Sequence, residues 1–359
     1  MSIRLLDLFA GVGGFRLAAQ KVSSDLNIDF TSVGFSENDR FATESYKAFY
    51  NTEGETEIGD IVSFCKSQKQ ICQLPNFNVL AGGFPCQPFS SMGRLEGFED
   101  ERGGVFFRII DILLEKQPQI VLLENVKNLL THDNRKTIGR VCKELKDAGY
   151  PFVEFDVFNS SDFGLPQNRN RVFILAMRDH ENSFSFSSEI VKEHFEGLKD
   201  PSVQHYETVI DILERDVSEI FYLSRKIKPT ILSNGSGNFH SNSEINQLIA
   251  RPLVATMVKM HRACQDNYYS DRFINSGGRE NDSKMPTAEL VETPIRKLTP
   301  REALMLQGFP EEFALKAMAA GVSNHQLYKQ SGNAVSVNVV YAILRYLADN
   351  ELFANPSNV

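Results

Sequence analysis

The sequence of 359 residues predicts an α/β protein in which a mainly parallel sheet is covered by helices on both faces. Short apolar runs rich in branched residues alternate with segments of helical period in the first half of the chain. Strands that alternate with helices in this way pair in parallel, because each helix returns the chain to the same edge of the sheet. The alternation is lost between residues 180 and 290, which predicts a second, smaller and irregular domain.

The strands expected in the first half are apolar runs that end in a turn or a polar residue. They cover residues 3–9, 30–37, 77–83 and 119–126, with a shorter strand near 57–61. Helices are expected over residues 103–117 and 135–149, where apolar residues recur on one helical face.

Two further strands, expected to be antiparallel, follow at residues 152–159 and 171–177, and helical spacing returns from 294 to 347. We therefore assign residues 1–179 and 294–359 to one domain and 180–293 to the other.

The composition is that of an ordinary globular protein, with 42% hydrophobic and 23% charged residues. Five scattered cysteines without a CxxC pair argue against a disulfide framework and a zinc site, and favour a reducing compartment. No apolar run is long enough to cross a bilayer, and the first residues show no secretory pattern. The sequence therefore predicts a cytoplasmic protein without a metal and without a membrane segment.

The charge distribution is uneven along the chain, although the net charge is −8. Residues 181–219 contain ten Asp or Glu and three Lys or Arg, whereas residues 222–284 contain nine Lys or Arg and five Asp or Glu. A locally basic segment is compatible with a nucleic-acid surface. A solvated face without a partner explains the same charges, so this observation alone leaves both interpretations open.

The ends of the first three expected strands carry residues suited to adenosine. The first strand ends in "DLFAGVGGF", a glycine-rich turn onto a helix that lacks the full G-x-G-x-x-G pattern. Glu37 lies 24 residues after Gly13 (37 − 13 = 24), where a ribose hydroxyl pair would be held. Asp60 could accept a hydrogen bond from an adenine amino group. Taken individually, each feature also has a purely structural explanation. The glycines could form a tight turn, Glu37 could be a carboxylate in the first turn of a helix, and Asp60 could be an ordinary turn residue.

A cysteine and a carboxyl group follow at the next two strand ends. Cys86 lies between Pro85 and Pro88, which makes it either a rigidly presented nucleophile or a chance residue in a stiff turn. Glu124 ends the next strand, and consecutive parallel strands are usually neighbours. This pair suits methylation of a pyrimidine at carbon 5, where a thiolate adds to carbon 6 while an acid protonates nitrogen 3. Burial could keep the carboxyl protonated. No lysine follows the glycines as in a P-loop, so the adenosine compound suggested is S-adenosylmethionine.

Six segments, in order along nearly the whole chain, resemble the motifs of C5-cytosine-specific DNA methyltransferases, and more narrowly those of bacterial type II modification methylases. They are "DLFAGVGGFRLA", "GGFPCQPFS", "ENV", "QNRNRVF", "RKLTPREALMLQGFP" and "QSGNAVSVNVV". The resemblance implies a doubly wound, Rossmann-like S-adenosylmethionine-dependent methyltransferase sheet and a smaller target-recognition domain.

The resemblance also implies roles for individual residues. The cofactor would be bound by Phe9, Gly11, Gly13, Glu37, Asp60, Ile61, Asn333 and Val335. The catalytic residues would be Cys86, Glu124, Arg169 and Arg171. The catalytic loop and its supports would include Pro85, Gln87, Ser90, Arg102, Asn125 and Gln167.

The implied reaction is methylation of carbon 5 of a cytosine flipped out of duplex DNA, with S-adenosylhomocysteine as the second product and no metal. The implied enzyme is a monomer that acts in a restriction-modification system, where a cognate restriction endonuclease would be its counterpart. Two alternatives stay open: a transfer-RNA cytosine-5 methyltransferase with the same motifs, and a DNA-binding protein without activity. The basic and aromatic insert, with Arg251, Arg262, Tyr268 and Tyr269, favours DNA.

Overall fold

The computed structural model describes residues 2–85, 104–178, 184–236, 239–257, 259 and 261–353. The chain forms two compact units. The first comprises Met1–Asn159, Asn170–Val203 and Val339–Val359, and the second comprises Ser160–Arg169 and Gln204–Asn338. These limits differ from the sequence boundaries at 180 and 294. Residues 160–169 belong to the second unit, and Ala250 is hydrogen-bonded to this loop twice: its carbonyl accepts the Asn168 amide (2.9 Å) and its amide donates to Pro166 O (2.7 Å).

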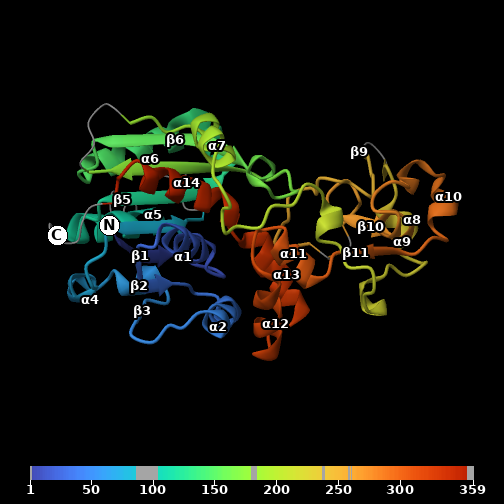
Figure 1. Ribbon diagram of the computed structural model, residues 1–359, viewed down its shortest axis with the longest axis horizontal. Coiled ribbons are helices and arrows are strands. Elements are labelled where there is room, and N and C mark those ends of the chain that lie inside the picture. Colours follow the sequence, from blue (N-terminus) through green and yellow to red (C-terminus); the bar gives the residue numbers. More distant parts are fainter. Residues whose placement is uncertain are drawn as a thin grey trace, which may run out of the picture. The chain divides into compact units, whose positions relative to one another are not determined.

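The first unit contains a seven-stranded sheet in the order β3-β2-β1-β4-β5-β7-β6 (Figure 1). Its strands are β1 (Ser2–Leu8), β2 (Asp29–Ser36), β3 (Thr56–Glu57), β4 (Val79–Gly83), β5 (Ile120–Val126), β6 (Phe152–Asn159) and β7 (Asn170–Met177). Of these strands only β7 runs opposite to the others, so that it pairs antiparallel with both β5 and β6. The strand order reverses between β1 and β4, and ligands of open α/β sheets bind at such a point. The predicted doubly wound α/β sheet is confirmed.

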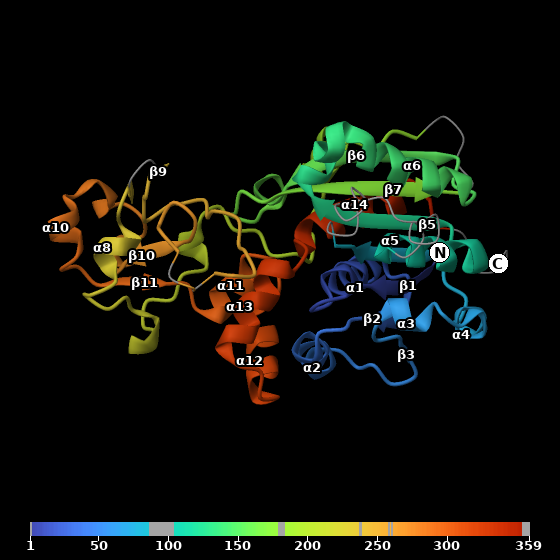
Figure 2. The same cartoon turned by 180° about the vertical axis from the view of Figure 1, so that it is seen from behind.

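Helices cover both faces of this sheet. They are α1 (Gly14–Leu26), α2 (Arg40–Phe49), α3 (Ile61–Phe64), α4 (Gln68–Gln73), α5 (Val105–Lys116), α6 (Lys136–Asp147), α7 (Ser188–Glu196) and most of α14 (Val337–Asp349), with short 3₁₀ turns η3 (Lys127–Leu130) and η4 (His132–Arg135). Figure 1 looks onto α1, α7 and α14, and Figure 2 looks onto α5 and α6 from behind.

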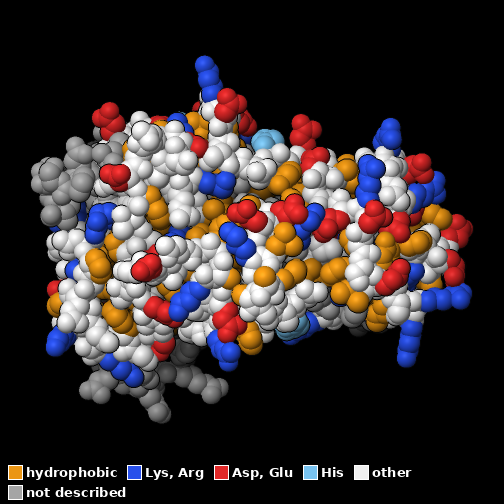
Figure 3. Space-filling model, turned by 60° about the horizontal axis from the view of Figure 1, so that its bottom comes forward, with side chains coloured by type: hydrophobic (Ala, Val, Ile, Leu, Met, Phe, Trp, Pro, Cys, Tyr) orange, Lys and Arg blue, Asp and Glu red, His pale blue; other side chains and the backbone are white. Residues whose placement is uncertain are grey.

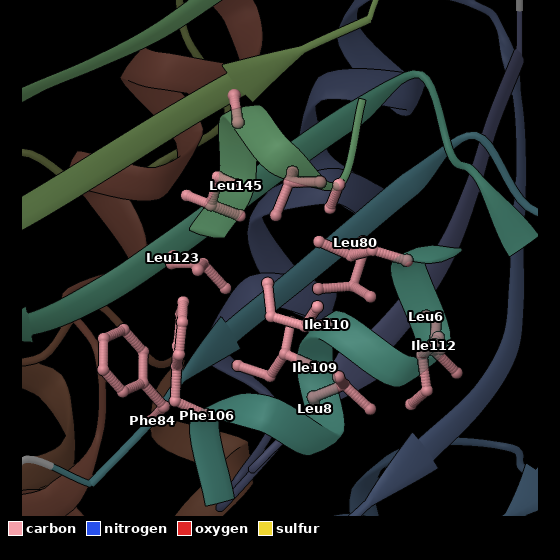
Figure 4. Close-up of a cluster of buried hydrophobic side chains, with 14 of the residues drawn as sticks. Leu6, Leu8, Leu80, Phe84, Phe106, Ile109, Ile110, Ile112, Leu123 and Leu145 are labelled. Carbon is pink, nitrogen blue, oxygen red and sulfur yellow. The ribbon is translucent and has the colours of Figure 1, made fainter. Parts of the chain in front are cut away.

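The core between the sheet and α5 and α6 is a continuous cluster of apolar side chains (Figure 4). Leu6 and Leu8 of β1 face it together, since residues two apart in a strand lie on the same side. From α5, Phe106 and Ile110 contribute to it one helical turn apart, as their spacing predicts. This packing fixes the strand ends from which the site residues project.

The second unit has little regular structure. Its elements are η5 (Ser160–Phe163), η6 (Val209–Asp211), η7 (Glu219–Phe221), α8 (Lys228–Ile231), β8 (Gly235–Ser236), β9 (Phe239–His240), β10 (Tyr268–Ser270), α9 (Asp271–Asn275), η8 (Asp282–Lys284), α10 (Thr287–Leu290), β11 (Ile295–Lys297), α11 (Pro300–Met305), α12 (Glu311–Ala319) and α13 (Asn324–Asn333). It has two apolar clusters of its own. Acidic and basic side chains are interspersed on the face drawn in Figure 3, so charge alone does not identify a nucleic-acid surface there.

The part of the chain that the structure describes contains neither a membrane-spanning helix nor a metal-binding group. None of its helices has the length and apolar character needed to cross a bilayer. No group of three or more His, Cys, Asp or Glu side chains in it could hold a metal ion.

Candidate active site

The turn that follows β1 has an unusual backbone. Phe9, Gly11 and Gly13 have φ angles of 53°, 54° and 80°, which lie in the left-handed region. Glycine adopts this region freely, but a bulky residue such as Phe9 does so rarely and at a cost in energy. The Ala10 amide donates to Ser36 O (2.8 Å) and thereby ties the turn to the end of β2. The glycines could be interpreted from the sequence, whereas the strain at Phe9 could not.

Glu37 follows β2 and contacts the glycine turn directly. Its Oε2 accepts the Gly11 amide at 2.8 Å and its Oε1 accepts the Asp39 amide at 2.7 Å. A carboxylate oxygen has two acceptor positions, so the half-buried Glu37 can accept two further hydrogen bonds. A vicinal pair of hydroxyl groups supplies two such donors. The sequence predicted that the glycine turn and Glu37 lie at the ends of two strands. The structure shows that the two are joined by a hydrogen bond.

Asp60 lies at the start of α3, not at the end of a strand as expected. The strand β3 ends at Glu57, and Asp60 caps the helix by accepting the Val62 and Ser63 amides at 3.2 Å each. The Ser63 hydroxyl also donates to Asp60, and these hydrogen bonds lower the pKa of that carboxyl. The Ser36 hydroxyl donates to Gly59 O (2.8 Å), which ties the exposed Asp60 segment to the end of β2.

Ile61 follows Asp60 and is the first residue of α3. The amide of such a residue has no acceptor within its own helix, so it is available to a ligand. The structure therefore places a carboxylate and an amide donor side by side at this point.

Glu124 and Arg171 form an ion pair at the carboxyl-terminal edge of the sheet. The distance from Arg171 Nε to Glu124 Oε1 is 3.0 Å, and the two side chains are 19% and 14% exposed. Because β7 runs antiparallel to β5, Arg171 at its start lies opposite Val126 at the end of β5. The sequence did not predict that this acid would be paired with the arginine.

Gly83, at the end of β4, lies opposite Glu124 in the parallel register of β4 and β5. A Cβ atom on Gly83 would be 3.1 Å from Glu124 Oε2, so glycine leaves room for the carboxyl group. Asn125, almost fully buried, donates from Nδ2 to Phe84 O at 2.8 Å. It thereby fixes the chain just before Pro85, whose side chain is exposed. The remaining predicted loop residues, Cys86, Gln87, Ser90 and Arg102, lie outside the described residues.

Gln167 and Arg169 connect segments within the second unit. The Arg169 guanidinium donates from Nη1 to Leu253 O (2.8 Å) and from Nη2 to Gly332 O and Ala334 O (3.0 and 2.9 Å). Gln167 accepts the Leu253 amide (2.9 Å) and donates to Leu306 O (2.9 Å). The two arginines expected to act together thus have different contacts: Arg171 reaches a carboxylate, whereas Arg169 is buried among backbone carbonyls.

The predicted cofactor residues Asn333 and Val335 flank one of these carbonyls, that of Ala334. Asn333 is exposed and Val335 is buried at the end of α13. Gly332 is required there for steric reasons, since a Cβ atom on it would overlap the backbone of Val254 and Ala255. Sequence reasoning missed this close approach, and the glycine in "QSGNAV" was its only signal.

The open sheet with one antiparallel strand places the chain in the class of proteins with the S-adenosylmethionine-dependent methyltransferase fold. A family model described as C-5 cytosine-specific DNA methylase matches residues 3–349. The chain belongs to this family and is a cytosine-5 DNA methyltransferase.

Two curated relatives illustrate the similarity. The chain is 35% identical over 343 residues to the type II methyltransferase M.NlaX of Neisseria lactamica, covering 95% of this chain and 94% of that protein. It is 36% identical over 341 residues to the type II methyltransferase M.NgoBI of Neisseria gonorrhoeae, covering 94% and 91%. Among solved structures, S. pombe Dnmt2 methyltransferase matches with a TM-score of 0.72 at 19% identity, covering 98% and 100% of the two chains.

Proposed function

We propose that this enzyme transfers a methyl group from S-adenosylmethionine to carbon 5 of a cytosine that is flipped out of a specific duplex DNA sequence. The observation that carries the proposal is the geometry at the ends of β4 and β5. Glu124 lies opposite Gly83, three residues before Cys86, and its carboxyl is oriented by Arg171. A nucleophile and an acid from adjacent strand ends can address one pyrimidine ring.

The glycine turn and the two acids fit the adenosine part of the cofactor. Glu37 retains acceptor positions for the ribose hydroxyls, and the exposed Asp60 carboxylate with the Ile61 amide suits an adenine edge. Phe9 supplies an aromatic surface that is half-buried against the core. Asn333 and Val335 complete the set in this proposal. When bound, S-adenosylmethionine supplies an electrophilic methyl group on a sulfonium centre.

The chain's own residues carry the remaining chemistry. Cys86, as a thiolate, forms a bond from sulfur to carbon 6 of cytosine while Glu124 gives a proton to nitrogen 3. Carbon 5 becomes nucleophilic and accepts the methyl group. The proton on carbon 5 is then released to solvent, and elimination of the thiolate, with return of the nitrogen-3 proton to Glu124, restores the aromatic ring and the free cysteine. Glu124 has to be protonated for the first step, and Arg171 lies against its carboxyl group.

Other residues act by position. Arg171 orients the Glu124 carboxyl, and Asn125 anchors the start of the catalytic loop that contains Gln87, Ser90 and Arg102. Arg169 and Gln167 act through the backbone segments that they hold together, including the one with Asn333.

Residues 180–293 recognise the DNA target in this proposal. The names of the relatives as type II methyltransferases support a role in a restriction-modification system. A cognate endonuclease as counterpart and a monomer as the active form are parts of the proposal.

The test is methyl transfer from labelled S-adenosylmethionine to duplex plasmid DNA and, in parallel, to transfer RNA. We expect incorporation into DNA, resistance of the product to one or a few endonucleases of a panel, and loss of incorporation in Cys86→Ser. Preferential labelling of transfer RNA would show that transfer RNA, and not DNA, is the substrate. Near-normal turnover of Cys86→Ser would exclude the covalent route.

A further inference from the structure

Two tyrosines enclose Gly13 from the side of α2. The Tyr50 hydroxyl donates to Gly13 O at 2.7 Å, and Tyr50 is almost fully buried. A Cβ atom on Gly13 would be 2.5 Å from Cε2 of Tyr50 and 2.8 Å from Cε2 of Tyr46. The rings therefore press against the Gly13 Cα while the hydroxyl holds its carbonyl. Gly13 is the N-cap of α1, so these contacts determine how the turn enters the helix.

Arg16, in the first turn of α1, packs against both rings. Its guanidinium carbon is 4.5 Å from the centroid of Tyr50 and 5.3 Å from that of Tyr46, which is the geometry of cation–π contacts. Arg16 Nη1 also lies 3.2 Å from the Tyr46 hydroxyl. Arg16 is 4% exposed, so these contacts occur away from solvent.

The buried charge of Arg16 is matched by Glu55, which is equally buried. Arg16 Nη2 lies 2.7 Å from Glu55 Oε1 and also donates to Asn51 O at 2.7 Å. The Ser32 hydroxyl of β2 donates to Glu55 Oε2 at 2.8 Å. Through these contacts the ion pair links the helix that follows the glycine turn to the loop after α2 and to β2. A buried pair with good geometry holds its surroundings in one arrangement, although it adds little net stability.

The glycine turn is thus held at two points. Glu37 accepts the Gly11 amide on one side, and Tyr50 donates to the Gly13 carbonyl on the other. We infer that Tyr50 and Arg16 are positioning residues that keep the glycine turn in its cofactor-binding shape, an inference that rests on the S-adenosylmethionine site proposed above. Neither residue needs to touch the cofactor, because Tyr50 acts through Gly13 and Arg16 acts through the tyrosine rings that enclose Gly13.

A purely structural role predicts a different result from a positioning role, and the chain offers a matched control. Tyr150 is fully buried in the same unit, and its hydroxyl donates to Pro118 O at 2.8 Å. Tyr50→Phe and Tyr150→Phe therefore each remove one buried hydroxyl-to-carbonyl hydrogen bond and keep the ring. Both should lower Tm to a similar extent, since each leaves one buried carbonyl without that donor.

The experiment measures the Kd of S-adenosylhomocysteine by calorimetry for the full-length wild type and both variants, together with kcat at saturating S-adenosylmethionine. We expect Tyr50→Phe to raise Kd about five- to tenfold with kcat nearly unchanged, and Tyr150→Phe to leave Kd at the wild-type value. Arg16→Lys keeps the charge opposite Glu55 but loses the stacking of the planar guanidinium on the tyrosine rings, so it should also raise Kd.

If the wild type binds S-adenosylhomocysteine and both Tyr50→Phe and Arg16→Lys bind it with the same Kd, the positioning role is overturned. The proposed cofactor site is not affected by that result. Equal weakening by Tyr150→Phe would also overturn the positioning role, because the effect would then follow general stability. Failure of the wild type itself to bind S-adenosylhomocysteine would instead contradict the proposed cofactor site.

Discussion

Arg171 Nε lies 3.0 Å from Glu124 Oε1, across the antiparallel pair formed by β5 and β7. This contact depends on β7 being placed between β5 and β6. A parallel strand at that position would bring its last residues, not its first, to the edge where Glu124 projects. The single antiparallel strand of the sheet therefore supplies the cation that orients the proposed acid.

Arg171→Lys should reduce kcat by about ten- to a hundredfold with little change in Tm. Lysine keeps a positive charge but lacks the planar fork that fixes the carboxyl orientation, and the pair is not deeply buried. Steady-state methyl transfer and thermal unfolding of the same preparation check this. A variant with wild-type kcat would show that the ion pair has no part in the reaction.

Unlike Arg171→Lys, the variant Arg169→Lys should mainly lower the free energy of unfolding. The Arg169 guanidinium reaches carbonyls of two separate segments, at Leu253 and at Gly332 and Ala334, which a single ammonium group cannot reproduce. We expect a loss on the order of 2–4 kcal/mol in the free energy of unfolding, measured with urea. Unchanged unfolding together with lost turnover would instead indicate direct contact with the substrate.

Gly83→Ala should slow turnover about tenfold or more while changing stability little. Its Cβ would lie 3.1 Å from Glu124 Oε2, so the carboxyl has to move by a few tenths of an ångström. The control is Gly139→Ala in α6, where a Cβ meets open space and helix propensity should add about 0.5–1 kcal/mol of stability. Wild-type kcat in both variants would contradict a tightly positioned acid.

Asp7→Asn should stabilise the protein increasingly as the pH rises. Burial raises the pKa of Asp7 to about 8, against the opposing effect of Arg16. Between about pH 4 and pH 8 the folded chain therefore keeps a proton that the unfolded chain releases, so the free energy of unfolding falls with pH over this window. Asparagine removes that dependence, and the gain at pH 8.5 should be on the order of a few kcal/mol.

Urea unfolding of the wild type and Asp7→Asn at pH 5, 7 and 8.5 measures this difference. Asp29→Asn, an exposed carboxyl at the start of β2, serves as the control and should follow the wild type at every pH. A constant difference between wild type and Asp7→Asn across the three pH values would exclude a raised pKa for Asp7.

The sequence predicted the features that depend on local pattern and on neighbouring strands. Apolar runs located six of the seven strands of the sheet to within about two residues. In the central strands β1, β4 and β5, burial on both faces makes such runs continuous. The rule that consecutive parallel strands are neighbours brought Glu124 next to the strand that leads to Cys86, and Gly83 indeed pairs opposite Glu124.

The features that the sequence did not predict arise from competition between local structures and from contacts between distant segments. Asp60 caps a helix because its carboxylate meets two free amides, and this competes with extending the strand. The left-handed Phe9 is held in place by the surrounding turn, since its own preference opposes that conformation. The family resemblance grouped Arg169 with Arg171, whereas the hydrogen-bond partners of Arg169 lie about 84 and 165 positions later in the chain.

The measurement that tests the central claim most directly is covalent trapping on duplex DNA containing 5-fluorocytosine in the target sequence, read by intact mass after incubation with S-adenosylmethionine. The fluorine prevents the last elimination, so the wild type should accumulate a protein–DNA adduct, Cys86→Ser none, and Glu124→Gln the adduct at a greatly reduced rate. Full methylation of normal duplex DNA without any adduct on the fluorinated duplex would contradict the account.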